Sequence, residues 1–174
     1  LGEYFPIHPN DHCNMGQSSN DSFPTTMHIA ISMKTNDVLF PAINNLIKTL
    51  EKKIREFKNI IKVGRTHLQD ATPITIDQEF GGYLNQVKNA FKRIKIAYEE
   101  VLYLAQGGTA VGTGINTSTK FIKGFIKAIQ IITDIPFKES KNKFEAISSH
   151  EPIIFFSSSV NTLVVACYKI SNDI

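Results

Sequence analysis

The chain has 174 residues, of which 42% are hydrophobic and 20% are charged, and its formal net charge is +3. This balance is typical of a folded globular protein and excludes a wholly disordered chain. The lysines are scattered among acidic residues, so no window predicts a nucleic-acid-binding arm or a basic membrane anchor. No run of roughly 18 apolar residues is present, so we expect no membrane-spanning segment.

Two cysteines, Cys13 and Cys167, are too few and too far apart for a disulfide framework, which favours a reducing compartment. The first residues carry neither the basic nor the apolar part of a signal peptide, and an initiator Met is absent. We therefore expect the chain to begin within a longer protein. Residues 1–22, rich in Pro, Asn, Asp, Ser and Gly, are expected to form a polar loop.

Apolar residues at steps of three and four predict four helices. The first runs over about 23–60, with Pro24 in its first turn and a kink at Pro41. The second, over about 75–104, follows a polar connection at 62–74 and begins with a capping box of Thr75 and Gln78. A shorter helix is expected over about 118–133, and a last one over about 150–174.

The predicted second helix would be roughly 45 Å long, which suits an extended bundle better than a compact globule. Strand-like alternation is scarce and internal repeats are absent. The expected fold is therefore all-α: long antiparallel helices of a bundle, incomplete at both ends because the chain stops inside a helix.

The first polar loop places Ser18, Ser19 and Asn20 directly before a helix. Hydroxyls, an amide and free backbone N–H groups at such a position can bind an anion. The alternative is that Ser19, Asn20 or Asp21 only caps the helix.

His8, His12 and Cys13 have side chains of the kinds that bind zinc. Because Pro9 disfavours a helical face there and no second ligand pair follows, we expect no metal site.

In the second polar loop, His67 can exchange a proton near neutral pH and Thr66 can donate to a substrate oxygen. A loop histidine that only forms structural hydrogen bonds is the alternative. The glycine-rich run 107–114 lacks the ending of a phosphate-binding loop and follows a helix rather than a strand, so a tight turn is the better interpretation.

These segments together resemble the fumarase/aspartase superfamily. The resemblance rests on three stretches in the family's order: the first polar loop through Phe23-Pro24-Thr25, then 62–80, then the glycine-rich run with Asn116-Thr117. Asn142-Lys143-Phe144-Glu145-Ala146 and the final Lys169–Ile174 complete it. His67, where aspartases usually have Gln, favours the class II fumarase branch over aspartate ammonia-lyase.

The resemblance implies reversible hydration of fumarate to (S)-malate, a step of the citric acid cycle, without a metal or organic cofactor. It implies that Ser18, Ser19, Asn20 and Thr66 bind substrate and that His67 is the catalytic proton donor and acceptor. It assigns His8, Asn10 and Asp11 to a second dicarboxylate site.

The resemblance also implies a homotetramer whose active sites draw residues from several subunits. The family's upstream Ser-Gly-Thr segment and downstream Gly-Ser-Ser loop are absent from residues 1–174. We therefore expect this part of the catalytic region to be inactive alone. The alternative is a non-catalytic truncated relative or helical assembly module. The default compartment is the cytoplasm; a mitochondrial location would require a transit segment before Leu1.

Overall fold

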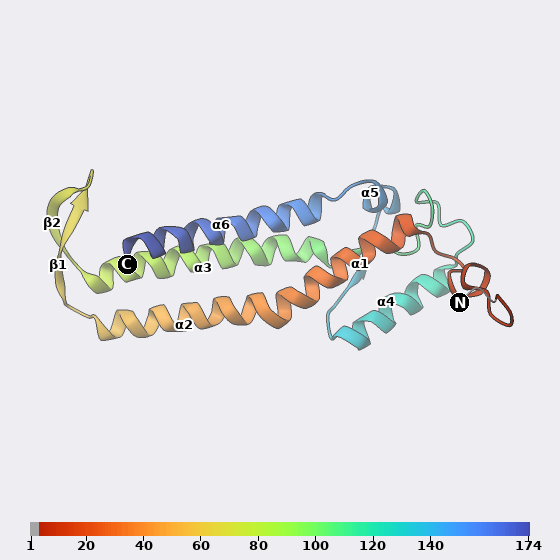
Figure 1. Ribbon diagram of the computed structural model, residues 1–174, viewed down its shortest axis with the longest axis horizontal. Helices are drawn as coiled ribbons and strands as arrows, with labels where there is room; N and C mark the ends of the chain where they lie inside the picture. The colour runs from red at the N-terminus through yellow and green to blue at the C-terminus, as the bar shows by residue number, and fades with distance from the viewer. Residues whose placement is uncertain (1–3) are drawn as a thin grey trace. The chain divides into compact units, whose positions relative to one another are not determined.

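A computed structural model describes residues 4–174, apart from the side chain of Asn10. The fold is dominated by helices, which confirms the all-α prediction (Figure 1). The chain divides into two compact units: unit 1 contains residues up to Thr35 together with Tyr98–Phe155, and unit 2 contains Asn36–Ala97 together with Phe156–Ile174. The first three residues of the predicted loop 1–22 lie outside the described part.

The rest of that predicted loop is more ordered than its composition indicated. A π-helical turn η1 spans Pro9–Cys13, and helix α1 already begins at Ser19 and continues to Lys34. A second π-helical segment, η2 (Thr35–Leu39), separates α1 from α2 (Phe40–Glu56). Pro41 lies in the first turn of α2, where its missing N–H leaves no hydrogen bond unmade. The predicted helix 23–60 is therefore two α-helices.

The prediction that residues 62–74 form a loop is wrong, because this polar connection forms a β-hairpin. Strand β1 (Ile61–Thr66) pairs antiparallel with β2 (Gln69–Thr75), with an irregular register between Val63 and Arg65. Gly64 lies at this irregularity, and a Cβ there would stand 2.5 Å from the carbonyl oxygen of Thr72. The bulge therefore requires glycine.

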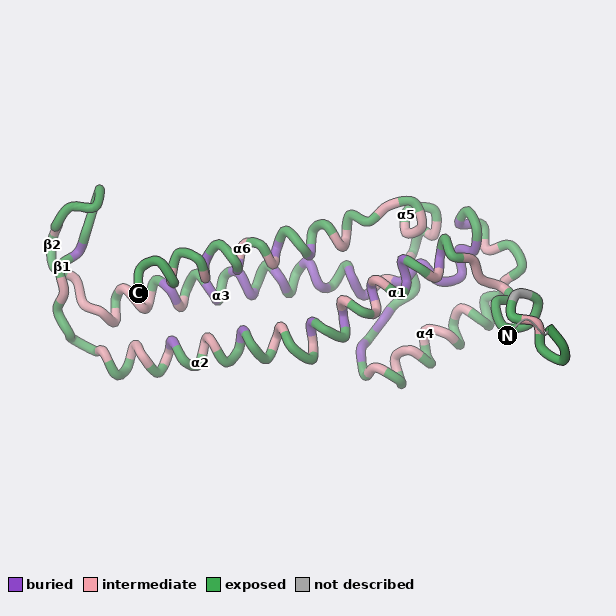
Figure 2. The backbone as a smooth tube through the Cα atoms, in the orientation of Figure 1, coloured by how far each residue is buried: buried purple, intermediate pink, exposed green. Residues whose placement is uncertain are grey.

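Unit 2 contains α2 and most of α3 (Ile76–Val101) and of α6 (Glu151–Asp173), and these parts of the three helices lie side by side (Figure 1). Phe40 stacks edge-on against Phe91 and Phe57 against Phe80, both with ring centroids 5.3 Å apart, so α2 and α3 are antiparallel. Buried positions recur along α3 at steps of three and four, as expected for a bundle helix (Figure 2). They are Tyr83, Val87, Ala90, Phe91, Ile94 and Ala97.

Unit 1 contains α1, α4 (Thr119–Thr133), α5 (Lys143–Ser148) and the short parallel pair β3 (Tyr103–Leu104) and β4 (Lys138–Glu139). Leu104 and Phe137 are fully buried beside this pair. The glycine-rich run 107–114 contains neither helix nor strand. It lies between β3 and α4, and it carries the contacts that organise the first candidate site.

Helix α6 presents a largely apolar and exposed surface. Over its most apolar 18 residues the mean hydropathy is 1.6 and 17% of residues are buried, so by length and composition it passes the test for a membrane-crossing helix. Core helices of soluble proteins pass the same test. The expectation that no segment crosses a membrane remains a prediction. Our criterion of a continuous apolar run missed α6 because Ser157, Ser158 and Ser159 interrupt it.

Candidate active site

The first polar loop ends in a capped helix. Ser18 has the extended backbone of an N-cap, and its Oγ accepts a hydrogen bond from the N–H of Asn20 at 3.2 Å. In return, Asp21 Oδ1 accepts from the N–H of Ser18 at 2.9 Å, which completes a capping box. The cap is therefore Ser18, one position before the three residues we had considered. Because Ser18 Oγ accepts here, its own O–H proton is available to a ligand.

Asp21 joins this helix start to the glycine-rich run. Its carboxylate is completely buried, and Oδ2 accepts hydrogen bonds from the N–H groups of Gly107 and Thr109, each at 2.9 Å. The side-chain amide of Gln106 donates to the same oxygen at 3.3 Å. Hydrogen bonds to a buried carboxylate are strong, so Asp21 fixes the loop against α1. Sequence analysis assigned Asp21 no such role, although its place three residues after Ser18 fits a capping box.

Two further contacts complete the attachment of the loop. The amide of Asn20 donates to the carbonyl oxygen of Ala110 at 2.8 Å. From the other side, Lys143 Nζ donates to the carbonyl oxygens of Gln106 at 2.7 Å and Leu104 at 3.2 Å. Burial lowers the pKa of Lys143, and the carboxylate of Glu139 opposes that shift. The lysine is thus a structural tie for this segment.

Beside this start of α1 the surface is hollowed. One hollow is lined by Gln17, Ser18, Thr109 and Asn116, among others, and the adjoining one by Ser18 and Ser19. A helix N-terminus with a serine on its rim favours a negatively charged group. Ser18 and Ser19 therefore lie at a position suited to bind a carboxylate, whereas Asn20 is not among the residues that line either hollow.

The predicted catalytic histidine lies at the tip of the hairpin. Thr66 and Gln69 are paired, so His67 and Leu68 form a two-residue turn, with φ of 51° and 62°. This is the conformation of a type I′ turn, which normally selects Asn-Gly because other residues are strained there. Both side chains of the turn are exposed, as is that of Thr66. The imidazole is therefore accessible from solvent within its own unit.

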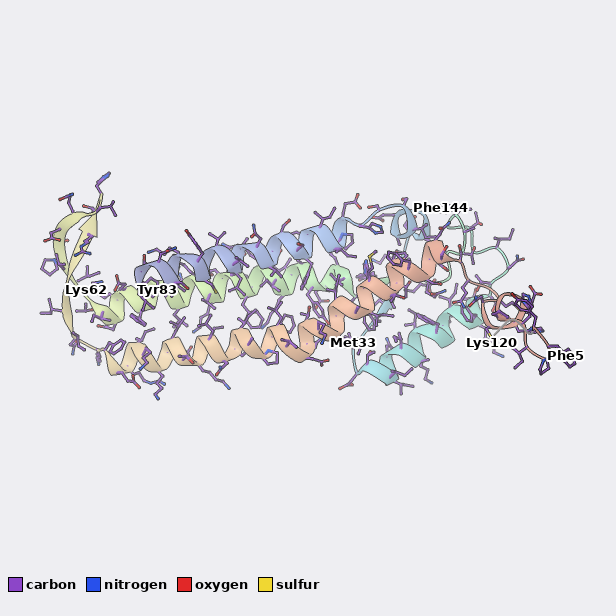
Figure 3. All side chains as sticks on the ribbon, viewed as in Figure 1. Phe5, Met33, Lys62, Tyr83, Lys120 and Phe144 are labelled. Carbon is purple, nitrogen blue, oxygen red and sulfur yellow. The ribbon has the colours of Figure 1, made fainter. Side chains whose placement is uncertain are left out.

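The base of the hairpin is tied to helices by polar contacts. Lys62 in the hairpin and Tyr83 on α3 are both labelled in Figure 3. Lys62 Nζ lies 2.7 and 2.8 Å from the two carboxylate oxygens of Glu79, and the hydroxyl of Tyr83 donates to Asp173 at 2.9 Å. Burial, followed by the hydrogen bond to Asp173, raises the pKa of Tyr83 well above its usual range. Contacts with Lys169 and Tyr83 lower the pKa of Asp173. These pairs join β1, α3 and α6 into one polar cluster.

The residues assigned to a second dicarboxylate site lie on or beside η1. His8 Nδ1 accepts from the N–H of Asp11 at 3.1 Å and lies 3.5 Å from Asp11 Oδ2. The N–H of His8 donates to His12 Nδ1 at 2.8 Å. Asn10 belongs to the same turn, so the three assigned residues are neighbours. Their role in binding remains a prediction.

The candidate residues fall into the two units: His8, Asn10, Asp11, Ser18, Ser19 and Asn20 in unit 1, and Thr66 and His67 in unit 2. Among residues 4–174, no three His, Cys, Asp or Glu side chains are grouped closely enough to hold a metal ion. Cys13 is exposed and Cys167 partly exposed, and both are free.

Comparisons with known proteins identify the class to which this fold and these loops belong. Residues 1–174 match the sequence profile of a lyase family. The chain therefore belongs to that lyase family. Its sequence is 53% identical to the class II fumarate hydratase of Rickettsia prowazekii over 173 residues, covering 99% of the chain and 38% of the relative. It is 52% identical to that of Brucella suis over 174 residues, again 38% of the relative.

Solved structures agree with the sequence relatives. The class II fumarase of Schistosoma mansoni superposes with a TM-score of 0.94 at 41% identity, over 97% of this chain and 38% of that one. A Brucella melitensis protein described as fumarate lyase:delta crystallin, bound to cobalt, gives 0.92 at 38% identity, over 99% and 37%. The resemblance to class II fumarases is confirmed. The chain spans under two fifths of the length of these relatives.

Proposed function

We propose that the full-length protein containing this chain is a class II fumarate hydratase, a lyase that interconverts fumarate and (S)-malate in the citric acid cycle. The observation that supports this proposal most strongly is the sequence identity of 52–53% to class II fumarate hydratases. The matches cover 97–100% of the chain and include both polar loops. The geometry agrees with this reaction, because one loop offers a carboxylate-binding helix start and the other offers an exposed imidazole.

The residues divide the chemistry between them as follows. Ser18, Ser19 and Asn20, with Thr66, bind a carboxylate of fumarate. His67 removes a proton from water as the oxygen bonds to one alkene carbon, and the π electrons move toward the carboxylate on the other carbon. Donors directed at that carboxylate stabilise its growing negative charge and so lower the barrier. The second carbon then takes up a proton, which gives malate; in dehydration each step reverses.

A homotetramer with active sites shared between subunits is part of the proposal. It is supported by the exposed apolar side chains of α6, which another subunit would cover: Ile154, Phe155, Val164, Val165 and Tyr168. Light scattering of the full-length protein should give four times the chain mass. We also propose that His8, Asn10 and Asp11 bind a second dicarboxylate and that the enzyme works in the cytoplasm.

The test is an assay in which the full-length protein is mixed with fumarate and the decrease in the ultraviolet absorbance of fumarate is measured over time. Formation of (S)-malate is expected. The same protein incubated with aspartate should release no ammonia; ammonia release without malate formation would identify an aspartate ammonia-lyase instead. Absence of both activities in a folded tetramer would favour a non-catalytic assembly module.

A further inference from the structure

Thr109, in the glycine-rich run, combines two features that are costly in a folded protein. Its side chain is 3% exposed, and its hydroxyl has no hydrogen-bond partner among residues 4–174. Leaving a buried hydroxyl unpaired costs about 1–3 kcal/mol. Its backbone φ is 56°, a region that β-branched residues rarely adopt. Both costs would be smaller with a different residue at this position.

The surrounding contacts hold the backbone that carries this hydroxyl. The N–H of Thr109 is bound to Asp21, and the next carbonyl, of Ala110, accepts from Asn20. The backbone of Thr109 is therefore held in place on both sides of its side chain. It lines the same hollow of about 690 Å³ as Ser18, at the start of α1. Two residues that are 91 positions apart in sequence therefore line one space.

The polar groups around this hollow indicate the chemistry of its ligand. Ser18 Oγ already accepts a hydrogen bond, and Thr109 has an uncommitted O–H, so each can donate to an incoming oxygen. The amide of Gln17 is occupied by Cys13 O and Asn14 Oδ1. Asp11 also lines the hollow, but its carboxylate is exposed and lies beside His8. Two hydroxyl donors at a helix N-terminus suit a carboxylate.

We propose that Thr109 is a further substrate-binding residue, whose hydroxyl donates to the carboxylate that Ser18 holds. The proposal rests on the proposed function for the identity of that carboxylate. A bound carboxylate oxygen would satisfy the buried hydroxyl. Only the unliganded protein then has the free-energy cost of an unpaired hydroxyl, and removing that cost on binding makes substrate binding more favourable.

The experiment compares Thr109→Val with Thr25→Val in the full-length protein. Thr25 is the matched control, because it is 2% exposed, its hydroxyl also lacks a partner, and it does not border the hollow. Each change removes an unpaired buried hydroxyl at nearly constant volume. We expect Thr109→Val to raise KM for fumarate about tenfold or more, the effect of losing one hydrogen bond to a charged group. Thr25→Val should leave KM unchanged.

Thr109→Ser retains the hydroxyl and should restore KM to within about twofold to threefold of the starting protein. If Thr109→Val does not fold, Thr109→Ala replaces it. A folded, active variant without the hydroxyl whose KM equals that of Thr25→Val would overturn the proposal while leaving the fumarate hydratase assignment intact.

Binding of succinate, a saturated dicarboxylate, gives a readout that needs no turnover. Calorimetry should show weaker succinate binding to Thr109→Val than to Thr25→Val. If the unmodified protein binds succinate but does not hydrate fumarate, the proposed function fails and this comparison alone decides the role of Thr109. If it neither binds succinate nor hydrates fumarate, both proposals are wrong.

Discussion

The glycine-rich run and the hairpin turn are both polar connections between helices, but they are held in opposite ways. The start of the run is buried, a carboxylate and an amide hold it, and an ammonium group holds the residue just before it. The turn at His67 and Leu68 is exposed and has strained φ angles, and Lys62 at the hairpin base contacts Glu79 of α3. This difference fits the two proposed roles: the glycine-rich run helps to form a fixed site for carboxylate binding, and the hairpin turn presents an accessible imidazole for proton transfer.

The largest expected effect is the loss of the carboxylate that pins the run. Asp21→Ala leaves the buried N–H groups of Gly107 and Thr109 without their acceptor, and we expect the free energy of unfolding to fall by about 3–5 kcal/mol. Urea denaturation measures this. Asp70→Ala, which removes an exposed carboxylate from the hairpin, is the control and should cost at most about 0.5 kcal/mol. Equal losses would remove the distinction between the two connections.

A pH effect should follow from His28, which lies in unit 1 and donates from Nδ1–H to the carbonyl oxygen of Val101, 2.8 Å away. Burial lowers the pKa of His28, with a smaller effect of the charge of His150. The unfolded chain therefore binds this proton more readily than the folded one. Stability should fall as pH drops below the unfolded value of about 6.5 toward the folded value.

The measurement is urea denaturation at about pH 7.5 and about pH 5.5. In His28→Gln the free energy of unfolding should decrease less between the higher and the lower pH than in the unmodified protein. In His12→Gln, at an exposed position, it should decrease as much as in the unmodified protein. An unchanged pH dependence in His28→Gln would assign the decrease to other groups.

A smaller effect is expected from the ion pair at the hairpin base. Lys62→Met should lower the free energy of unfolding by about 1 kcal/mol, because both partners are partly exposed and water screens them. The loss should shrink in about 1 M salt. A double-mutant cycle with Glu79→Gln measures the pair; a coupling energy near zero would show that it does not anchor the hairpin.

The smallest effect should be a gain. Leu68 is 93% exposed and has a φ of 62°, so Leu68→Asn exchanges a strained residue for one that tolerates this conformation. We expect the hairpin to be stabilised by about 0.5 kcal/mol. Hydrogen exchange of the Gln69 amide should slow. Faster exchange would mean that the leucine side chain itself stabilises the turn.

Helix positions were predictable because apolar periodicity reports burial, as the spacing of Tyr83, Val87 and Ile94 shows. The hairpin was not, because its exposed strands carry no alternation of buried and exposed residues and its turn lacks Asn-Gly. The role of Asp21 was missed for another reason. Its partners Gln106, Gly107 and Thr109 lie 85–88 residues away, so no local pattern indicated these contacts.

The candidate site was predicted through a family resemblance, since local chemistry alone favoured a structural role for His67. The structure adds the capping function of Ser18 and the contacts of the run with α1. It also shows that His67 is exposed within its own unit, and the catalytic role of this residue stays a prediction.

The most direct test of the central claim is the turnover of fumarate by full-length His67→Asn. Asparagine tolerates a positive φ, so the hairpin should remain folded while the proton-transferring group is lost. We predict that kcat falls by a factor of about 10²–10⁴, with the unfolding midpoint unchanged. A folded variant that hydrates fumarate as fast as the unmodified protein would contradict the account.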